Sequence, residues 1–126
     1  MEGDRREVGK RGEDAAAKFI KKRGYKIVER NFTCPLGEMD IIALDKKTLC
    51  FIEVKTLSSK TYGPPEIAVN VHKQRKLSQV ALAYLNRKHL HDINARFDVI
   101  AVTLSPEGER IELIKDAFEL RYPEPY

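Results

Sequence analysis

The chain has 126 residues, of which 23 are Lys or Arg and 19 are Asp or Glu, so its formal net charge is +4. With 42% hydrophobic and 33% charged residues, the composition is typical of one folded domain and excludes collagen-like, low-complexity and disordered chains. We therefore expect a single domain over residues 1–126. No apolar run reaches the roughly 18 residues of a membrane span, and the charged N-terminus lacks a signal-peptide core. The sequence thus predicts a cytoplasmic protein without membrane contact.

The first half of the chain predicts one helix followed by three strands. Apolar residues recur with helical spacing over residues 6–23, and Gly24 then gives the expected C-terminal signal. Strands rich in Ile, Leu, Phe and Val follow, and a short polar turn joins the last two. We expect these strands at 25–32, 38–44 and 49–55, with the turn at 45–48.

The second half of the chain completes a mixed sheet. A stretch rich in Ser, Gly and Pro at 58–65 predicts a long loop. Asn70 can cap a second helix that runs to about Lys88. A strand at 97–104 carries the continuous apolar run of a strand buried on both faces, and a strand at 110–114 follows it, before a short helix or tail. The order α-β-β-β-α-β-β predicts an α/β fold with a mixed central sheet flanked by helices.

The hairpin formed by the second and third strands brings charged residues together at its open end. With the turn centred on residues 46–47, opposed residues have numbers that sum to 93, so Asp40 faces Glu53 and Glu38 faces Lys55. Two directly opposed carboxylates repel each other, which a purely structural hairpin avoids. The same register predicts two apolar pairs nearer the turn: Ile42 with Phe51, and Leu44 with Leu49.

A divalent cation would relieve this repulsion. Mg²⁺ prefers oxygen ligands and takes one or two carboxylates, while water and substrate phosphate complete its coordination shell. Asp40 and Glu53 are therefore candidate metal ligands. Lys55 lies on the same face, where it could hold an attacking water or stabilise charge on a reacting phosphate. The alternative is a solvated patch of ion pairs without a metal, and from the residues alone both interpretations remain open.

Three further residues could take part in this site. Glu13 lies on the border of the apolar face of the first helix, where it could reach the metal or be an ordinary exposed residue. Lys73, one turn before the apolar Leu77, could face the same cleft and contact phosphate. Asp98 enters a buried strand, where a structural role as the partner of Arg96 is favoured over a role as a third metal ligand.

Short segments stand out along nearly the whole chain: Gly9-x-x-Gly12-Glu13, Gly24-Tyr25, Arg30-Asn31, residues 37–43, residues 51–55, Lys73, Ala81-x-x-Tyr84-Leu85 and residues 96–99. Together they resemble the YraN-like family of small bacterial proteins. That family is similar in turn to the PD-(D/E)xK nucleases, which include archaeal Holliday junction resolvases. This chain has Met39 where the name of the nuclease motif has Pro, as do many members of the wider superfamily.

This resemblance implies a restriction endonuclease-like αβββαβ core that carries a catalytic motif of Asp40, Glu53 and Lys55. It implies that Mg²⁺ or Mn²⁺ is bound by Asp40 and Glu53, with the Val54 carbonyl as a further ligand. Glu13 would match the acidic residue of the first helix, and so would count as both a metal ligand and a catalytic residue. The implied activity is that of a metal-dependent endonuclease that hydrolyses DNA phosphodiester bonds.

A nucleic-acid partner also suits the sequence pI of about 9.1. Lys73 and three lysines of the first helix, Lys18, Lys21 and Lys22, are predicted to bind phosphates on either side of the reacting one. A homodimer is an expectation by analogy with the resolvases. Two alternatives compete with the nuclease: a non-catalytic DNA-binding module on the same scaffold, and a small interaction protein without a metal site.

Overall fold

The computed structural model describes residues 2–58 and 69–121. Five strands form one sheet in the order β1-β2-β3-β4-β5, in which β3 and β4 are parallel and the other neighbours are antiparallel. The mixed α/β fold and the predicted order of elements are thereby confirmed. Apart from the end of β3, the predicted loop at 58–65 lies outside the described residues. The elements are α1 (Glu2–Lys22), β1 (Lys26–Cys34), β2 (Gly37–Asp45), β3 (Thr48–Ser58), α2 (Val71–Arg87), β4 (Asn94–Ser105) and β5 (Gly108–Phe118).

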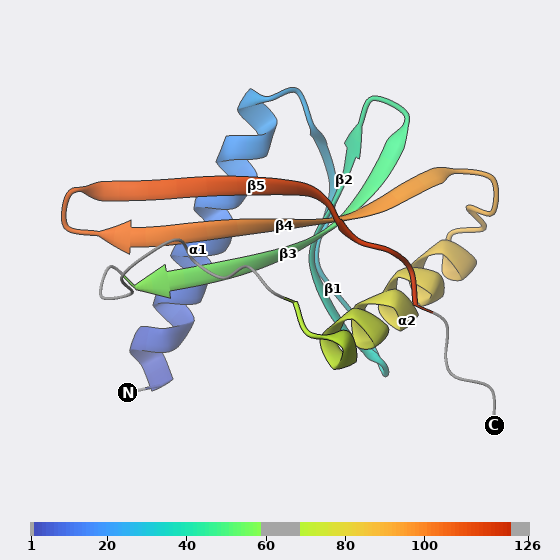
Figure 1. Ribbon diagram of the computed structural model, residues 1–126, viewed down its shortest axis with the longest axis horizontal. Helices are drawn as coiled ribbons and strands as arrows, with labels where there is room; N and C mark the ends of the chain where they lie inside the picture. The colour runs from blue at the N-terminus through green and yellow to red at the C-terminus, as the bar shows by residue number, and fades with distance from the viewer. Residues whose placement is uncertain (1, 59–68, 122–126) are drawn as a thin grey trace.

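The two helices cover opposite faces of the sheet (Figure 1). Consecutive residues of a strand point to opposite faces, so the central strands bury apolar side chains against both helices. No helix in the described part of the chain is long and apolar enough to cross a membrane. The core on the α1 side includes Ala16, Ile20, Ile41, Ile52 and Ile100, and the core on the α2 side includes Leu77, Tyr84, Ile42, Phe51 and Val99.

Local sequence signals set the ends of both helices. After α1, Gly24 adopts a φ of +90°, and the N–H of Tyr25 donates to the carbonyl of Ile20 at 3.0 Å. This is the glycine-dependent closure expected at a helix C-terminus. The side chain of Asn70 accepts from the N–H of Lys73 at 2.8 Å, which confirms the predicted N-terminal cap of α2.

The β2–β3 hairpin has the predicted register close to its turn, where the two predicted apolar pairs are formed. The ladder ends where Ile41 pairs with Ile52. The predicted pairs Asp40–Glu53 and Glu38–Lys55 are therefore not formed, and that part of the predicted register was wrong. Beyond the last pair, β3 runs away from the lower part of β1 and β2 (Figure 1).

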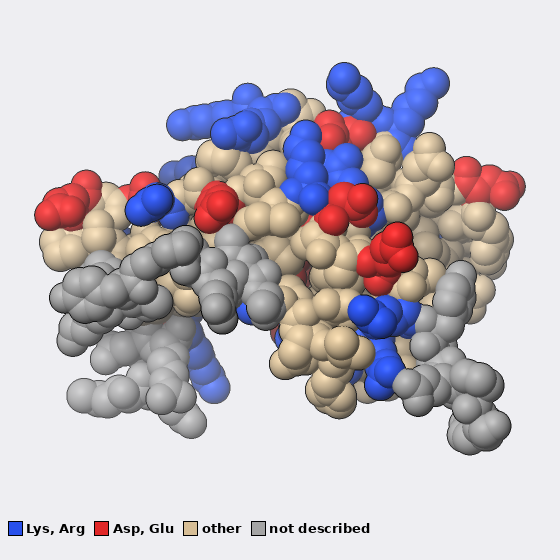
Figure 2. Space-filling view, in the orientation of Figure 1, with Lys and Arg blue, Asp and Glu red and all other residues tan. Residues whose placement is uncertain are grey.

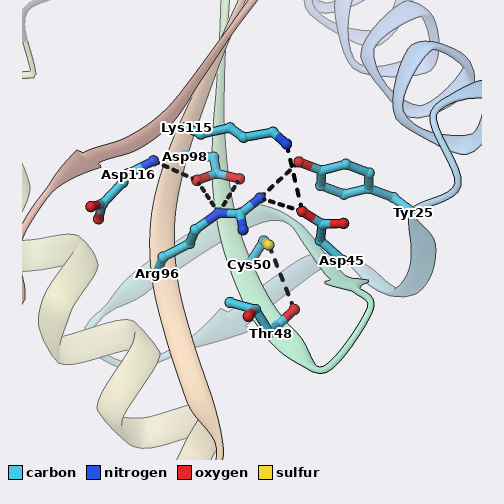
Figure 3. A network of polar contacts seen from close by, with 8 residues as sticks. All are labelled: Tyr25, Asp45, Thr48, Cys50, Arg96, Asp98, Lys115 and Asp116. Carbon is cyan, nitrogen blue, oxygen red and sulfur yellow. Dashed lines mark hydrogen bonds and ion pairs between the residues drawn. The ribbon is translucent and has the colours of Figure 1, made fainter.

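A network of polar contacts near the hairpin turn ties β4 to its neighbours (Figure 3). Asp98, which is 0% exposed, accepts from Nε of Arg96 at 2.9 Å, and the guanidinium also reaches Asp45 at 2.9 Å and the Tyr25 hydroxyl at 2.8 Å. The predicted structural role of Asp98 is thereby confirmed. Burial, together with the Asp98 charge, raises the pKa of the neighbouring Cys50 thiol to about 12.

β5 extends to Phe118, well past the predicted end at residue 114. The register between β4 and β5 shifts beside Asp98, where Asp116 adopts a φ of 53°. At this irregularity the Asp98 carboxylate accepts the N–H of Asp116 at 2.9 Å. The Asp98 side chain therefore accepts the backbone N–H that has no partner in the interrupted ladder, and β5 continues past this point.

Gly12 lies where α1 packs against β3, and a Cβ at this position would overlap the hydroxyl group of Thr56. We expect Gly12→Ala to lower the free energy of unfolding by about 1–3 kcal/mol, because the helix must move off the sheet. Gly9→Ala is the matched control, since a Cβ there meets nothing within 4 Å, and it should stabilise the helix by up to about 1 kcal/mol. Urea unfolding measures both changes, and equal stabilities for the two variants would contradict close packing at Gly12.

Candidate functional site

At Asp40 the side chains of β2 switch from one face of the sheet to the other. Met39 lies in the core on the α2 side and Ile41 in the core on the α1 side, although a regular strand would put both on one face. On β1, Asn31 stands between the residues that pair with Ile41 and Met39, and it adopts a left-handed conformation with φ of 53°. Asn tolerates this conformation better than most residues. The break takes Asp40 out of the regular ladder at the point where β3 separates from β2.

The side chain of Asp40 fills part of this separation. Its Oδ2 atom accepts the backbone N–H of Val54 at 2.8 Å. Burial raises the pKa of Asp40, and the hydrogen bond from Val54 acts in the opposite direction. The N–H and C=O of one strand residue point toward the same edge, so the Val54 carbonyl also faces the gap beside Asp40. The carbonyl that was predicted as a metal ligand therefore lies on the same side as the carboxylate.

Glu53 shares a pocket of about 220 Å³ with Asp40, Glu38 and two lysines of α2, Lys73 and Lys76. Its side chain is 14% exposed, and its Oε1 atom lies 3.7 Å from Nζ of Lys73. Burial raises the pKa of Glu53 to about 7, and the negative charge of Asp40 adds to this effect. The structure thus brings together Asp40, Glu53 and Lys73, which the sequence predicted to lie at one site.

Glu13 approaches the same region from α1. Burial raises its pKa, and Asp40 is the first of the charges that raise it further. In the amide orientation that satisfies its neighbours, Asn31 donates to Oε1 of Glu13 at 2.7 Å and to Oε1 of Glu38 at 3.1 Å. Asn31 therefore links a helix carboxylate to a strand carboxylate beside Asp40.

Lys55 follows Glu53 by two positions on β3, whose pairing with β4 is regular along its whole length. The two side chains therefore leave the same face of the sheet. Lys55 is partly buried, and its positive charge lowers the pKa of Glu53. This places the predicted lysine of the motif within electrostatic range of the pocket.

The lysines predicted on the first helix lie at greater distances. Lys21 and Lys22 are exposed in the last turn of α1, about 12–14 Å along the helix axis from Glu13 at 1.5 Å per residue. Lys18 is also exposed, and it lies on α1 between Glu13 and Lys21. Figure 2 shows Lys and Arg gathered along the upper edge, near the end of α1 and the hairpin turn, with acidic side chains among them on the face below. The structure does not bring Lys21 or Lys22 to the pocket.

The donor set of the pocket is small. Within residues 2–58 and 69–121, no group of three or more His, Cys, Asp and Glu side chains is arranged so that it could hold a metal ion by itself. The two carboxylates of Asp40 and Glu53 nevertheless face one pocket, with the edge of Val54 beside them. Two carboxylates are the usual protein contribution to a Mg²⁺ site that water and phosphate complete.

Sequence reasoning missed Asn31 and Arg30 as contributors to this region. Arg30 donates to Asp14 of α1 at 2.8 Å, which fixes the middle of β1 to the helix. The pair Arg30-Asn31 is one of the segments that carry the family resemblance, and this was the available signal. Its role depends on a positive φ and on contacts to α1, which no spacing in the sequence reveals.

The raised pKa of Glu53 leads to a prediction about pH. The unfolded chain releases this proton near pH 4.5, whereas the folded protein holds it until about pH 7. Because the folded state binds more protons in this window, the free energy of unfolding should fall as pH rises through it. In EDTA, the Tm of the wild type should fall from pH 5 to pH 8 by on the order of 5 °C more than that of Glu53→Gln, which lacks the group. Parallel pH profiles in thermal melts would contradict the assignment.

The fold and the pocket together define a small α/β protein with a carboxylate-lined pocket where two central strands separate. Residues 12–102 match the family described as "Uncharacterised protein family UPF0102". The chain belongs to this family, which is the YraN-like family that the sequence predicted.

Curated relatives cover nearly the full length of the chain. A UPF0102 protein of Syntrophus aciditrophicus is 54% identical over 115 residues, with 91% of each chain covered. One of Geobacter sulfurreducens is 55% identical over 116 residues, with 91% of each chain covered. One of Pelobacter propionicus is 51% identical over 122 residues, covering 94% of this chain and 87% of the relative. These names state no activity, so the nuclease function stays a prediction.

Proposed function

We propose that the protein is a divalent-cation-dependent nuclease that cleaves DNA. The observation that carries the proposal is the meeting of Asp40 and Glu53 in one pocket, with Lys55 and Lys73 beside them. Hard oxygen ligands together with a nearby ammonium group suit the hydrolysis of a phosphate ester. A DNA substrate also agrees with the cytoplasmic location that the sequence predicts.

The residues of the pocket fit Mg²⁺ or Mn²⁺. Asp40 and Glu53 are partly buried, and each carboxylate has a raised pKa, chiefly because of burial. A bound cation would offset this cost, and the chemistry of the donors is that of a hard cation. Asp40, Glu53 and the Val54 carbonyl would hold the ion, and Glu13, which Asn31 links to Glu38, would add its negative charge from the α1 side. When bound, the ion would polarise the scissile phosphate and lower the pKa of a water.

The chain's own groups supply the other parts of the reaction. The N–H of Val54 fixes the orientation of Asp40. Lys55 orients the attacking water and stabilises the negative charge that develops on the phosphate. Lys73, close to Glu53 at the pocket wall, binds a non-bridging phosphate oxygen, as lysines do at phosphate sites. Glu53 acts in its ionised form, which its pKa of about 7 favours above neutral pH.

The direct test is incubation of the purified protein with branched, single-stranded and duplex DNA in EDTA, Mg²⁺ or Mn²⁺. We expect cleavage with either cation and none in EDTA. Salt-dependent DNA binding without cleavage would replace the nuclease by a non-catalytic DNA-binding module. If the protein neither binds DNA nor changes its Tm in Mn²⁺, the small interaction protein becomes the better account.

Lys55 should matter for cleavage and not for DNA affinity. We expect Lys55→Ala to lower the single-turnover cleavage rate at saturating DNA by about 10²–10³-fold, because its charge acts where charge develops in the transition state. Affinity measured in Ca²⁺ should change little, since one phosphate contact among several contributes only about one unit to the salt slope. Lys47→Ala, at the exposed hairpin turn, is the control. A Lys55→Ala rate equal to that of the wild type would remove Lys55 from the mechanism.

A further inference from the structure

A second hollow lies on the α1 side of the pocket carboxylates. It has a volume of about 620 Å³, and we call it the α1 hollow; its lining includes Arg6, Lys10, Glu13, Arg30 and Asn31. Asn31 also bonds to Glu38, which lines the first pocket. The pocket and the α1 hollow are therefore adjacent, and the hydrogen bonds from Asn31 to Glu13 and Glu38 lie between them.

The two hollows carry different charges. Glu38, Asp40 and Glu53 give the pocket three carboxylates against the two α2 lysines. The α1 hollow has three cations against two carboxylates, because Asp14 lines it as well. Arg30 pairs with Asp14 at 2.8 Å, and this contact holds the pKa of Asp14 below its usual value.

The geometry of α1 directs two cations into this hollow. Arg6 and Lys10 are four residues apart, so they occupy the same face of the helix with Cβ atoms about 5–6 Å from each other. Glu13 follows Lys10 by three residues on that face and lies beside Asn31. A row of cations therefore leads along α1 toward the carboxylates, and Arg30 joins it from β1. Arg6 and Lys10 are both exposed and can reach a ligand in solvent.

We propose that the α1 hollow binds the sugar–phosphate backbone of DNA next to the phosphate that is cut. The inference rests on the proposed nuclease function and adds a subsite to it. Arg and Lys side chains in a groove contact phosphates without reading sequence, and they set the position of the strand. With Lys73 and Lys76 on the α2 side and the α1 hollow on the other, the strand is held on both sides of the carboxylates. The subsite uses the N-terminal half of α1, whereas the sequence predicted Lys18, Lys21 and Lys22.

The test compares three double variants that each remove two positive charges. Arg6→Gln/Lys10→Gln alters the α1 hollow, and Lys21→Gln/Lys22→Gln alters the other end of the same helix. Lys46→Gln/Lys47→Gln, at the exposed hairpin turn, is the control. Binding of labelled single-stranded and branched DNA is measured in Ca²⁺ over a range of salt concentrations. All the substituted side chains are exposed, and thermal melts verify that each variant is folded.

We expect Arg6→Gln/Lys10→Gln to weaken binding about tenfold and to lower the slope of log K against log salt by about 1–2, since two phosphate contacts are lost. Lys46→Gln/Lys47→Gln should bind within about twofold of the wild type, and Lys21→Gln/Lys22→Gln should lose less affinity than Arg6→Gln/Lys10→Gln. An unchanged affinity and slope for Arg6→Gln/Lys10→Gln, with a wild type that cleaves DNA, overturns the subsite and leaves the nuclease in place. Weaker binding only for Lys21→Gln/Lys22→Gln also overturns it. A wild type that binds no DNA overturns both proposals.

Discussion

Replacing Asp40 by Asn should lower the rate of metal-dependent DNA cleavage by about 10³-fold or more. The Asn carbonyl oxygen can still accept the N–H of Val54, which Asp40 binds at 2.8 Å, so the strand ends should stay in place while the negative charge is lost. A divalent cation contributes several kcal/mol to stabilising the transition state. At about 1.4 kcal/mol per tenfold change in rate, loss of the ligand gives an effect of this size.

The measurement is single-turnover cleavage at saturating DNA in Mg²⁺ and in Mn²⁺. Asp92→Asn is the matched control, because Asp92 is exposed in the segment before β4; it should cleave at the wild-type rate. The rise of Tm in Mn²⁺ should also disappear in Asp40→Asn, since a ligand stabilises a protein only through its binding to the folded state. If Asp40→Asn cleaves within about threefold of the wild type, Asp40 is not a ligand of the reacting metal.

Replacing Asp98 by Ala should lower the free energy of unfolding by about 3–5 kcal/mol, the largest stability effect that we expect. Asp98 is 0% exposed and accepts from Arg96 at 2.9 Å and from the N–H of Asp116 at 2.9 Å. Its removal leaves the Nε–H of Arg96, in a side chain only 19% exposed, without its acceptor, and leaves a backbone N–H in the β4–β5 irregularity without an acceptor. Both losses carry the full cost of an unsatisfied polar group.

Urea unfolding and thermal melts measure this change, and Tm should fall by at least about 10 °C. Asp45→Ala is the internal comparison, because Asp45 bonds to the same arginine but is 20% exposed. It should cost about 1–2 kcal/mol, since water still reaches the Asp45 carboxylate and Arg96 keeps Asp98 as its partner. Equal effects for the two variants would show that the buried acceptor at Asp98 is not what ties β4 to β5.

The sequence alone determined the local parts of the fold. Helical spacing and Gly24 located α1, Asn70 located the start of α2, and the four-residue turn set the hairpin register as far as Ile41 and Ile52. Each of these features depends on residues that are neighbours along the chain or across one tight turn, so periodicity and turn chemistry suffice to predict them. The sequence also predicted that Asp40 and Glu53 meet, and they share one pocket although the ladder ends before they would pair. The matching segments predicted the family.

Tertiary structure alone decided how the site is assembled. A positive φ at Asn31 accompanies the switch of side-chain faces in β1 and β2. The β2–β3 ladder ends at the pair Ile41–Ile52, before it reaches Asp40 or Glu38. Gly12 lets α1 approach β3, so that Glu13 meets Asn31 and the basic half of the helix lies beside the pocket. Alternation along a strand fixes side-chain direction only while the strand stays regular. The angle at which a helix crosses a sheet depends on packing between residues far apart in the chain, and for that reason the sequence could not show which basic residues of α1 line a hollow beside the carboxylates.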